Sequence, residues 1–387
     1  MAAAGARVLR TTPARPAARG RAWRGRGAIL SSLALCAAAT VGVADPAARF
    51  QAVFEAETRG MGTVAVGAGF AFGDDAPTLL VRGNRFKGSA EAVPEDATWH
   101  VGSITKSVTA TLAMRRVEGQ ALDLKSPLEA ILPDLAEGMH PDWRRITMDE
   151  LLGHRSGLPP NLPYRAFLSK ETDARAERRR LLEAAWGKPI RGERGTFRYS
   201  NTGYVLAGHV LETLDGRHWE ALVAEEIAGP LGLTSLGAGA PDGPGTPWGH
   251  RSFVGYLTAV DPGDARSDNP PWMGPAGTLH MSLNDLLEWG RVHVAACRGE
   301  RPEFLSTAAC LRMRDGQAEN YGYGWVVQEM RTHGLTAVWH NGSNTMWYAV
   351  LTLIPERDLV ITVTLNAPMG AQGDALMNAL ADALLGG

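Results

Sequence analysis

The chain has 387 residues, 45% apolar and 21% charged, so it is long enough to bury one large core or two lobes. All 41 acidic residues lie at Asp45 or later, whereas residues 1–27 hold seven of the 39 basic residues. The segment from residue 45 onward therefore carries a net charge of about −9, which argues against nucleic acid or an anionic membrane surface as a partner.

Residues 1–44 have the layout of a signal peptide. Seven arginines without any acid are followed by an apolar run from Ala28 to Ala44, which ends in small residues before Asp45 and Pro46. This order predicts export to the periplasm or the extracellular space, with cleavage near Ala44. The alternative is a retained anchor, because the run is close to the lower length limit for a membrane span. We expect no other membrane partner.

The first elements after this leader are a helix and two strands. Pro46–Thr58 is predicted to be helical, and Thr63–Phe72 and Pro77–Arg82 are predicted to be strands. From Ser103 onward, apolar residues recur at helical spacing until Gly119, which predicts a helix with one buried face.

The middle of the chain is predicted to be mostly helix and loop. Residues 120–190 contain an Arg/Glu-rich stretch, Glu171–Arg180, which is typical of a solvated helix face. A second amphipathic helix follows Asn201 and ends at Gly216. Residues 236–274 are rich in Gly, Pro and Asp without periodicity, which predicts a long surface loop over a functional region.

The last part of the chain returns to strands. Four alternating or apolar runs are predicted to lie in one sheet, and a helix closes the chain over Asp374–Leu385. The four runs are Trp325–Met330, Thr336–His340, Trp347–Ile354 and Leu359–Leu365.

Strands at both ends around a helical middle predict an α/β fold of the α+β type, with an antiparallel sheet flanked by helices. After the signal peptide, residues 45–387 would form one domain. Its sheet lobe would comprise about 45–125 and 315–387, and an inserted helical lobe about 126–314. A site would lie in the cleft between the lobes.

Cys297 and Cys310 are the two cysteines that follow the leader. In an oxidising compartment they could pair and close a short loop, which is worth about 3 kcal/mol on the loop-entropy model. Two buried thiols are the alternative, because a sequence does not give the separation of the Cα atoms. Of the two interpretations, we favour the disulfide.

A serine and a lysine stand three residues apart in the segment GSITKSV. The i, i+3 spacing places the Ser103 hydroxyl and the Lys106 amine on one face of the first helical turn. A serine is a poor nucleophile until a base removes its proton; a desolvated lysine can be that base, and arginine cannot. Lysine is scarce here, five against 34 arginines, so we interpret the pair as catalytic. The structural alternative is a serine helix cap beside a surface lysine.

Two further motifs lie downstream. In Tyr199-Ser200-Asn201 the tyrosine could relay protons to a leaving group and the asparagine could hold a substrate amide. In His340-Asn341-Gly342-Ser343, Gly342 would let a substrate approach a strand edge. The N–H groups of Ser343 and Ser103 could then form an oxyanion hole. The structural alternatives are a turn tyrosine with an asparagine cap, and a plain hairpin turn.

These motifs together make the sequence similar to the serine β-lactamase or penicillin-recognising family, on the side of class C β-lactamases and D-alanyl-D-alanine carboxypeptidases. The resemblance covers nearly all of residues 50–385, including HVGSITKSVTATLAM, ITMDELLGHRSGLPP, RYSNTGYVLAGHVLE and WHNGS. It implies a β-lactamase/transpeptidase-like fold, with Ser103 as the acylated nucleophile, Lys106 as its base and Tyr199 as a second acid/base.

The resemblance also implies substrate-binding residues. Asn201 would contact the substrate, His340 and Gly342 would line the edge strand, and Asn161, just after GLPP, would place an amide in the pocket. Class C β-lactamases typically have Lys-Thr-Gly where this chain has His-Asn-Gly, and a histidine there resembles the D-amino-acid peptidases and esterases of the family. A histidine at its usual pKa would be mostly neutral at pH 7, so we expect any β-lactam acylation to improve toward pH 6.

The expected function is a monomeric serine hydrolase that cleaves an amide or ester bond of a small molecule or peptide through an acyl-enzyme. D-amino-acid peptides or small esters would be the main substrates, and β-lactams secondary. The alternatives are a true class C-like β-lactamase and a non-catalytic ligand-binding relative. No cofactor or metal is expected, since the ten histidines form no H-E-x-x-H motif. An α/β-hydrolase is disfavoured because the sequence contains no G-x-S-x-G.

Overall fold

The computed structural model describes residues 45–61, 64–163, 166, 173–316 and 318–386. The leader predicted over residues 1–44 lies outside these residues, so export stays a prediction. Within the described part of the chain, no helix has both the length and the apolar character needed to cross a bilayer.

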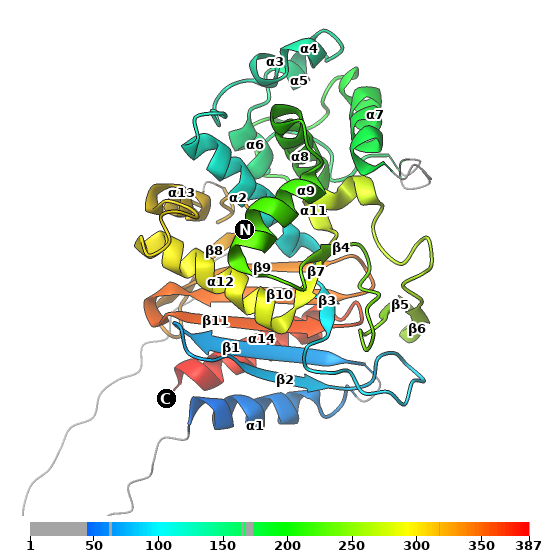
Figure 1. Ribbon diagram of the computed structural model, residues 1–387, viewed down its shortest axis with the longest axis vertical. Helices are drawn as coiled ribbons and strands as arrows, with labels where there is room; N and C mark the ends of the chain where they lie inside the picture. Colours follow the sequence, from blue (N-terminus) through cyan, green and yellow to red (C-terminus); the bar gives the residue numbers. More distant parts are fainter. Residues whose placement is uncertain (1–44, 62–63, 164–165, 167–172, 317, 387) are drawn as a thin grey trace, which may run out of the picture. The chain divides into compact units, whose positions relative to one another are not determined.

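A six-stranded antiparallel sheet contains strands from both ends of the described chain (Figure 1). Its strand order is β2-β1-β11-β10-β9-β8. The strands are β1 (Val66–Phe72), β2 (Thr78–Arg82), β8 (Val326–Met330), β9 (Leu335–Ser343), β10 (Tyr348–Ile354) and β11 (Leu359–Leu365). β1 pairs with β11 along its whole length, from Val66 opposite Leu365 to Phe72 opposite Leu359. The prediction that both chain ends build one sheet is confirmed.

Helices cover both faces of this sheet. α1 (Pro46–Thr58) and α14 (Gly370–Leu385) lie on one face, and α12 (Leu283–Arg298) packs on the other (Figure 1). Every residue of β10 and β11 is buried. A strand that is covered on both faces has a nearly continuous apolar sequence, which accounts for the Val-, Ile- and Leu-rich runs at these two strands.

The helix α2 (Thr105–Glu118) follows a 3₁₀ turn, η1 (Gly102–Ile104), and lies on the same side of the sheet as α12 (Figure 1). It packs against α8 (Asn201–Asp215), α11 (Gly274–Gly277) and α13 (Thr307–Arg314). The remaining helices are α3 (Leu128–Ile131), α4 (Pro133–Ala136), α5 (Pro141–Arg144), α6 (Met148–Leu152), α7 (Ala174–Trp186), α9 (Trp219–Val223) and α10 (Gly229–Leu231), with the π-helical turn η3 (Ala224–Ala228) and the 3₁₀ turns η4 (Pro271–Met273) and η5 (Pro355–Arg357).

The Gly/Pro-rich segment 236–274 is more structured than a long loop. It contributes β4 (Gly237–Ala238) to a small sheet with β3 (Thr98–His100) and β7 (Leu279–Ser282). It also forms a hairpin of β5 (Gly249–Phe253) and β6 (Tyr256–Val260). β4 pairs with β7 outside the segment, which a local periodicity cannot reveal, whereas the hairpin of β5 and β6 pairs within the segment and was not predicted from its sequence.

The predicted solvated face of the stretch Glu171–Arg180 is wrong for part of α7. Arg178 is fully buried and Glu177 is 2% exposed. The Arg178 guanidinium contacts the buried Glu212 carboxylate and donates to the Trp272 carbonyl oxygen at 3.0 Å. The burial arises because a carboxylate on α8 compensates the charge, and the sequence of α7 alone does not show that partner.

Cys297 and Cys310 form a disulfide, with their Cα atoms 5.1 Å apart. The bond joins the end of α12 to α13, and it confirms the favoured interpretation of the two cysteines.

Candidate active site

Ser103 and Lys106 lie together where η1 leads into α2. Lys106 Nζ is 2.9 Å from Ser103 Oγ and donates to the Ala276 carbonyl oxygen at 2.5 Å. The lysine side chain is fully buried, and burial lowers its pKa well below the usual value. An amine whose pKa is lowered in this way can accept a proton from the neighbouring hydroxyl.

The backbone turn at the serine is in direct contact with the end of β9. Gly102 has a φ of +51°, and a Cβ atom on it would lie 2.4 Å from the Ser343 nitrogen. A Cβ atom on Gly342 would lie 2.1 Å from the Val101 carbonyl oxygen and 2.4 Å from the Ser103 nitrogen. Gly342 thus makes room for the chain's own serine turn, rather than for a substrate as predicted. The contact places two backbone N–H groups, those of Ser103 and Ser343, on adjoining segments.

The end of β9 also provides a strand edge beside the serine. β8 pairs with β9 only from Leu335 to Trp339. Among the described residues, no strand pairs with residues 340–343 on that side of β9. An extended substrate can form main-chain hydrogen bonds at such an edge.

Tyr199 lies against both members of the serine–lysine pair. Its hydroxyl is hydrogen-bonded to Ser103, and Lys106 Nζ lies 4.9 Å from the centre of its ring. Burial raises the pKa of Tyr199 well above its usual value, although the hydrogen bond to Ser103 lowers it in part. The phenol therefore stays protonated at neutral pH and can donate its proton. The sequence predicts this tyrosine, and the structure brings it to the serine.

His340 is part of the same cluster, but its ring nitrogens are engaged inside the protein. Nε2 is 3.1 Å from the Tyr321 hydroxyl and Nδ1 is 2.5 Å from the carbonyl oxygen of Asn341. Nδ1 must therefore donate to that carbonyl, and Nε2 must accept from the tyrosine. The prediction that His340 offers a substrate its hydrogen bond is not supported, because no ring N–H is left over. Burial, followed by the charge of Lys106, lowers the pKa of His340 to about 3 despite its bond to Asn341.

His154 and Tyr321 complete the cluster, and the sequence did not predict either of them. The His154 ring centre is 4.3 Å from that of Tyr199 and 4.6 Å from that of Tyr321. His154 Nδ1 accepts a hydrogen bond from the Ser200 N–H at 3.1 Å, which fixes the start of α8 behind the tyrosine. Burial, with the charges of Lys106 and His340, holds the pKa of His154 well below its usual value. The only local feature that could have indicated this site was a single histidine, His154, after a short helix.

Asn161 and Asn201 are joined directly. The Asn201 side-chain amide donates to Asn161 Oδ1 at 2.8 Å, and the Asn201 backbone N–H donates to the Pro160 carbonyl oxygen at 2.8 Å. Both predicted amide groups therefore lie together at the start of α8, two residues from Tyr199.

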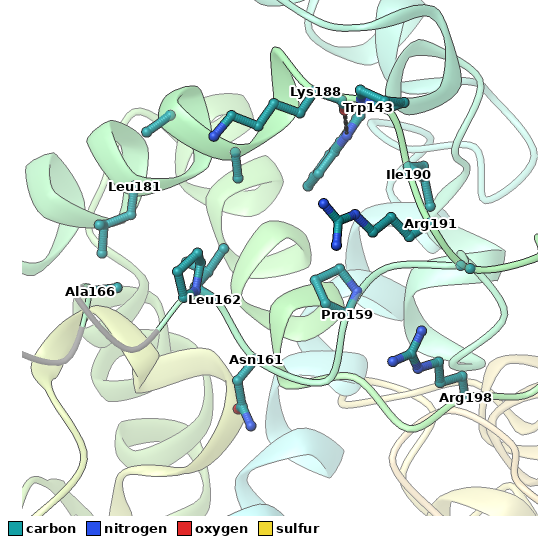
Figure 2. A pocket seen from close by; sticks show the side chains of 16 residues that line it. Trp143, Pro159, Asn161, Leu162, Ala166, Leu181, Lys188, Ile190, Arg191 and Arg198 are labelled. Carbon is teal, nitrogen blue, oxygen red and sulfur yellow. Dashed lines mark hydrogen bonds between the residues drawn. The ribbon is translucent and has the colours of Figure 1, made fainter.

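A cavity of about 630 Å³ opens beside Asn161 (Figure 2). Its walls are largely apolar and include Trp143, Pro159, Leu162, Leu181 and Ile190. Three exposed cations, Lys188, Arg191 and Arg198, also line it, and none of the described lining residues is acidic. Figure 2 shows the Arg191 side chain pointing into the cavity. The cavity can hold an apolar group that is attached to a negatively charged one.

One group of potential metal ligands occurs in the described residues, formed by Glu212, His218 and Glu220. The carboxylates of Glu212 and Glu220 already contact the Arg178 guanidinium, at 2.9 Å for Glu220. This guanidinium supplies the positive charge between them, so we do not assign a metal to the group.

Comparisons with known proteins show which family the chain is similar to. The Beta-lactamase family model matches residues 52–385. Penicillin-binding protein 4 of Amycolatopsis lactamdurans is 25% identical over 301 residues, which span 74% of this chain and 77% of that protein. The D-alanyl-D-alanine-carboxypeptidase/endopeptidase AmpH of Escherichia coli (strain K12) is 21% identical over 71% of this chain and 72% of its own length.

A likeness in fold alone extends to the D-amino acid amidase from Ochrobactrum anthropi SV3, solved in complex with D-phenylalanine. It superposes with a TM-score of 0.72 at 20% identity, and the match covers 88% of this chain and 99% of the amidase. With a family model that spans nearly the whole described chain, the protein belongs to the Beta-lactamase family of serine hydrolases.

Proposed function

We propose that this protein cleaves an amide or ester bond through an acyl-enzyme formed on Ser103. The observation that carries the proposal is the buried amine of Lys106, 2.9 Å from Ser103 Oγ. A lysine beside a simple helix cap would extend into solvent, whereas this one is fully buried and its pKa is lowered by burial. The burial and the lowered pKa support a role for Lys106 as a base rather than as a surface charge.

Acylation would begin when neutral Lys106 accepts the Ser103 proton and Oγ attacks the substrate carbonyl carbon. The carbonyl π electrons move to oxygen, and the N–H groups of Ser103 and Ser343 stabilise the oxyanion. When the tetrahedral intermediate collapses, the bond to the leaving group breaks and Tyr199 donates its proton to the departing nitrogen or oxygen. Lys106 then returns a proton to Tyr199. The raised pKa of Tyr199 suits this donor role.

Deacylation would use the same groups in reverse. A water molecule gives its proton to the Tyr199–Lys106 pair as its oxygen attacks the acyl carbon. The bond from the carbonyl carbon to Ser103 Oγ then breaks, and Oγ recovers a proton. Each group ends the cycle in its starting protonation state.

D-amino-acid amides, peptides and esters are the substrate class that we propose. The carboxypeptidase and amidase names of two similar proteins support it. His340 supports weak turnover of β-lactams, because its neutral ring provides no charge-assisted bond to a carboxylate. The cavity beside Asn161 supports substrates with an apolar group next to an anion.

A panel of substrates tests this proposal on the purified protein. D-phenylalanine amide, a p-nitrophenyl ester, a D-Ala-D-Ala peptide and nitrocefin should be compared, with Ser103→Ala as the inactive control. A fluorophosphonate probe should label the wild type and not the variant. Absence of labelling on folded wild-type protein would favour a non-catalytic relative, and fastest turnover of nitrocefin would favour a class C-like β-lactamase.

We also propose that the protein is exported. The support is the basic and then apolar order of residues 1–44. N-terminal sequencing of the protein from its host should begin near Asp45, and an intact cytoplasmic chain would contradict the proposal.

A further inference from the structure

The segment before η4 places a buried carboxylate between the two backbone turns that meet at Ser103. The side chain of Asp268 is 6% exposed, and its Oδ1 lies 2.8 Å from His100 Nε2. The same oxygen accepts a hydrogen bond from Asn344 Nδ2 at 2.7 Å. His100 lies just before the serine turn and Asn344 just after Ser343, so one carboxylate oxygen is in contact with both sides.

His100 connects Asp268 to the residue before the nucleophile. His100 Nδ1 accepts a hydrogen bond from the Gly102 N–H at 3.1 Å. A neutral ring that accepts at Nδ1 carries its proton on Nε2, on the side of the carboxylate. The ring is fully buried and stacks on Trp347, with centroids 5.6 Å apart. Gly102, whose φ is +51°, is thereby held in the conformation that directs the Ser103 N–H.

Asn344 connects Asp268 to the other backbone turn. Its Oδ1 accepts hydrogen bonds from the N–H groups of Met346 and Trp347, both at 3.1 Å. These bonds close the turn that follows β9, in which Thr345 has a φ of +72°. The backbone of Ser343 enters this turn directly.

We propose that Asp268 is a positioning residue for the oxyanion hole, and the proposal rests on the hydrolase function given above. Through His100 it fixes the turn that carries the Ser103 N–H, and through Asn344 it fixes the turn that follows the Ser343 N–H. The two donors belong to separate elements, and the hydrogen bonds given for the described residues join the Ser103 side chain to Lys106 and the Ser343 side chain to the Trp347 carbonyl oxygen, not to each other. One carboxylate oxygen in contact with both His100 and Asn344 keeps their separation constant while charge develops on the substrate oxygen.

The chemistry of Asp268 permits a sharp test. Oδ1 contacts His100, Asn344 and the Asn269 N–H, whereas the buried Oδ2 has no hydrogen-bond partner among the described residues. Asparagine at this position would keep the oxygen that all three contacts use. Asp268→Asn should therefore keep most of the wild-type acylation rate constant, and Asp268→Ala should not.

The experiment measures the first-order acylation rate constant and the substrate dissociation constant separately, in single turnovers with a p-nitrophenyl ester. Asp268→Ala should lower the rate constant by about 10- to 100-fold, since loss of an oxyanion donor outright costs 10²–10³-fold. The dissociation constant of the ester should change little, because the hole acts in the transition state. The affinity for phenylboronic acid, which forms a tetrahedral serine adduct, should fall together with the rate constant.

Asp285→Ala is the matched control. Asp285 is also a buried carboxylate, and it accepts hydrogen bonds from the Ser235 backbone and hydroxyl at 2.8 and 2.6 Å rather than from residues of the serine turn. Its loss should lower the stability of the fold without lowering the acylation rate constant of the folded molecules. A purely structural role for Asp268 would give the same pattern as this control.

Substitutions of His100 separate its two contacts. His100→Asn keeps an acceptor near the Gly102 N–H, and His100→Gln keeps a donor toward Asp268. If the bridge positions the hole, each variant should resemble Asp268→Ala in rate constant and boronate affinity. Wild-type acylation rates in folded Asp268→Ala would overturn the inference. Absence of acylation in the wild type would instead overturn the proposed function.

Discussion

Among the described residues, the cationic side chains of Arg178 and Lys106 are completely buried, and their surroundings differ. Arg178 on α7 contacts the carboxylates of Glu212 and Glu220. Lys106 on α2 has its hydrogen bonds to the Ser103 hydroxyl and the Ala276 carbonyl oxygen. Within the described residues, Lys106 forms no ion pair with a carboxylate.

The difference shows which buried cation is structural and which is chemical. Carboxylates around a guanidinium stabilise a charge that the side chain cannot lose, so Arg178 ties α7 to α8 and to the chain at η4. Neutral oxygens around an ammonium compensate its charge poorly, so burial lowers the pKa of Lys106 instead. A buried amine without a carboxylate is suited to proton transfer.

Lys106→Arg tests the comparison most directly, because it places a permanent cation in the site that lacks carboxylates. We expect acylation to slow by about 10³-fold, within the range for loss of a general base. A stopped-flow ester assay would measure it, with the exposed Lys125→Arg, which lies outside the cavity beside Asn161, as control. Near-wild-type acylation in Lys106→Arg would show that the lysine acts only by charge.

The lowered pKa of Lys106 also predicts how acylation by the wild type depends on pH. The deprotonated amine is the active form, so acylation should increase as pH rises through the lowered pKa of Lys106. The unfolded chain binds a proton at this lysine up to its usual pKa. The free energy of unfolding should therefore also increase as pH rises from the lowered pKa of the folded chain to the usual pKa of the unfolded chain.

Arg178→Ala leaves the buried Glu212 without its cation. Breaking a buried pair in this way should reduce the free energy of unfolding by about 3–5 kcal/mol. The neighbouring Arg179 pairs with Glu183 on the exposed side of the same helix, so Arg179→Ala should cost about 0.5 kcal/mol or less. Urea unfolding of the two variants measures the contrast. Similar losses in both would contradict the structural role of Arg178.

Tyr199→Phe asks whether the proton of Lys106 reaches the leaving group through the phenol. We expect hydrolysis of an amide to slow by about 10²-fold, the usual contribution of a general acid. A p-nitrophenyl ester should be affected less, because p-nitrophenolate leaves without a proton. Equal losses on the amide and the ester would indicate that Tyr199 only packs against Ser103.

What the sequence could predict follows from the range of the interactions. Ser103 and Lys106 share a helical turn, and Tyr199 and Asn201 share the start of one helix, so local spacing is sufficient for them. The apolar runs of the central strands are also local patterns, and they predict those strands. The partners of Arg178 and Asp268 come from other elements, and no periodicity in their own segments indicates them.

The engagement of His340 is another long-range effect, because Tyr321 and Lys106 set its state. A histidine was expected from the sequence at its usual pKa. Burial beside a second basic group gives it instead a pKa of about 3.

The smallest expected effect concerns this histidine, and it replaces the expectation that β-lactam acylation improves toward pH 6. Because the pKa of His340 is about 3, the ring stays neutral from pH 5 to 8, and the ratio of nitrocefin to ester acylation should not rise between pH 7 and 6. His340→Gln should therefore show the same pH profile as the wild type over that range.

Unlike the acylation profile, the stability of His340→Gln should depend on pH differently from that of the wild type. The folded pKa of His340 is depressed, so the unfolded chain binds a proton below about pH 6.5 that the folded chain does not. Wild-type stability should fall as pH drops from 6.5 toward 3, and His340→Gln should lack that part of the loss. Unfolding curves at pH 7 and pH 4 measure the difference between the two proteins.

The opposite result for both measurements is also clear. A wild-type acylation profile with a step near pH 6 that disappears in His340→Gln would show that the ring titrates where an exposed histidine does.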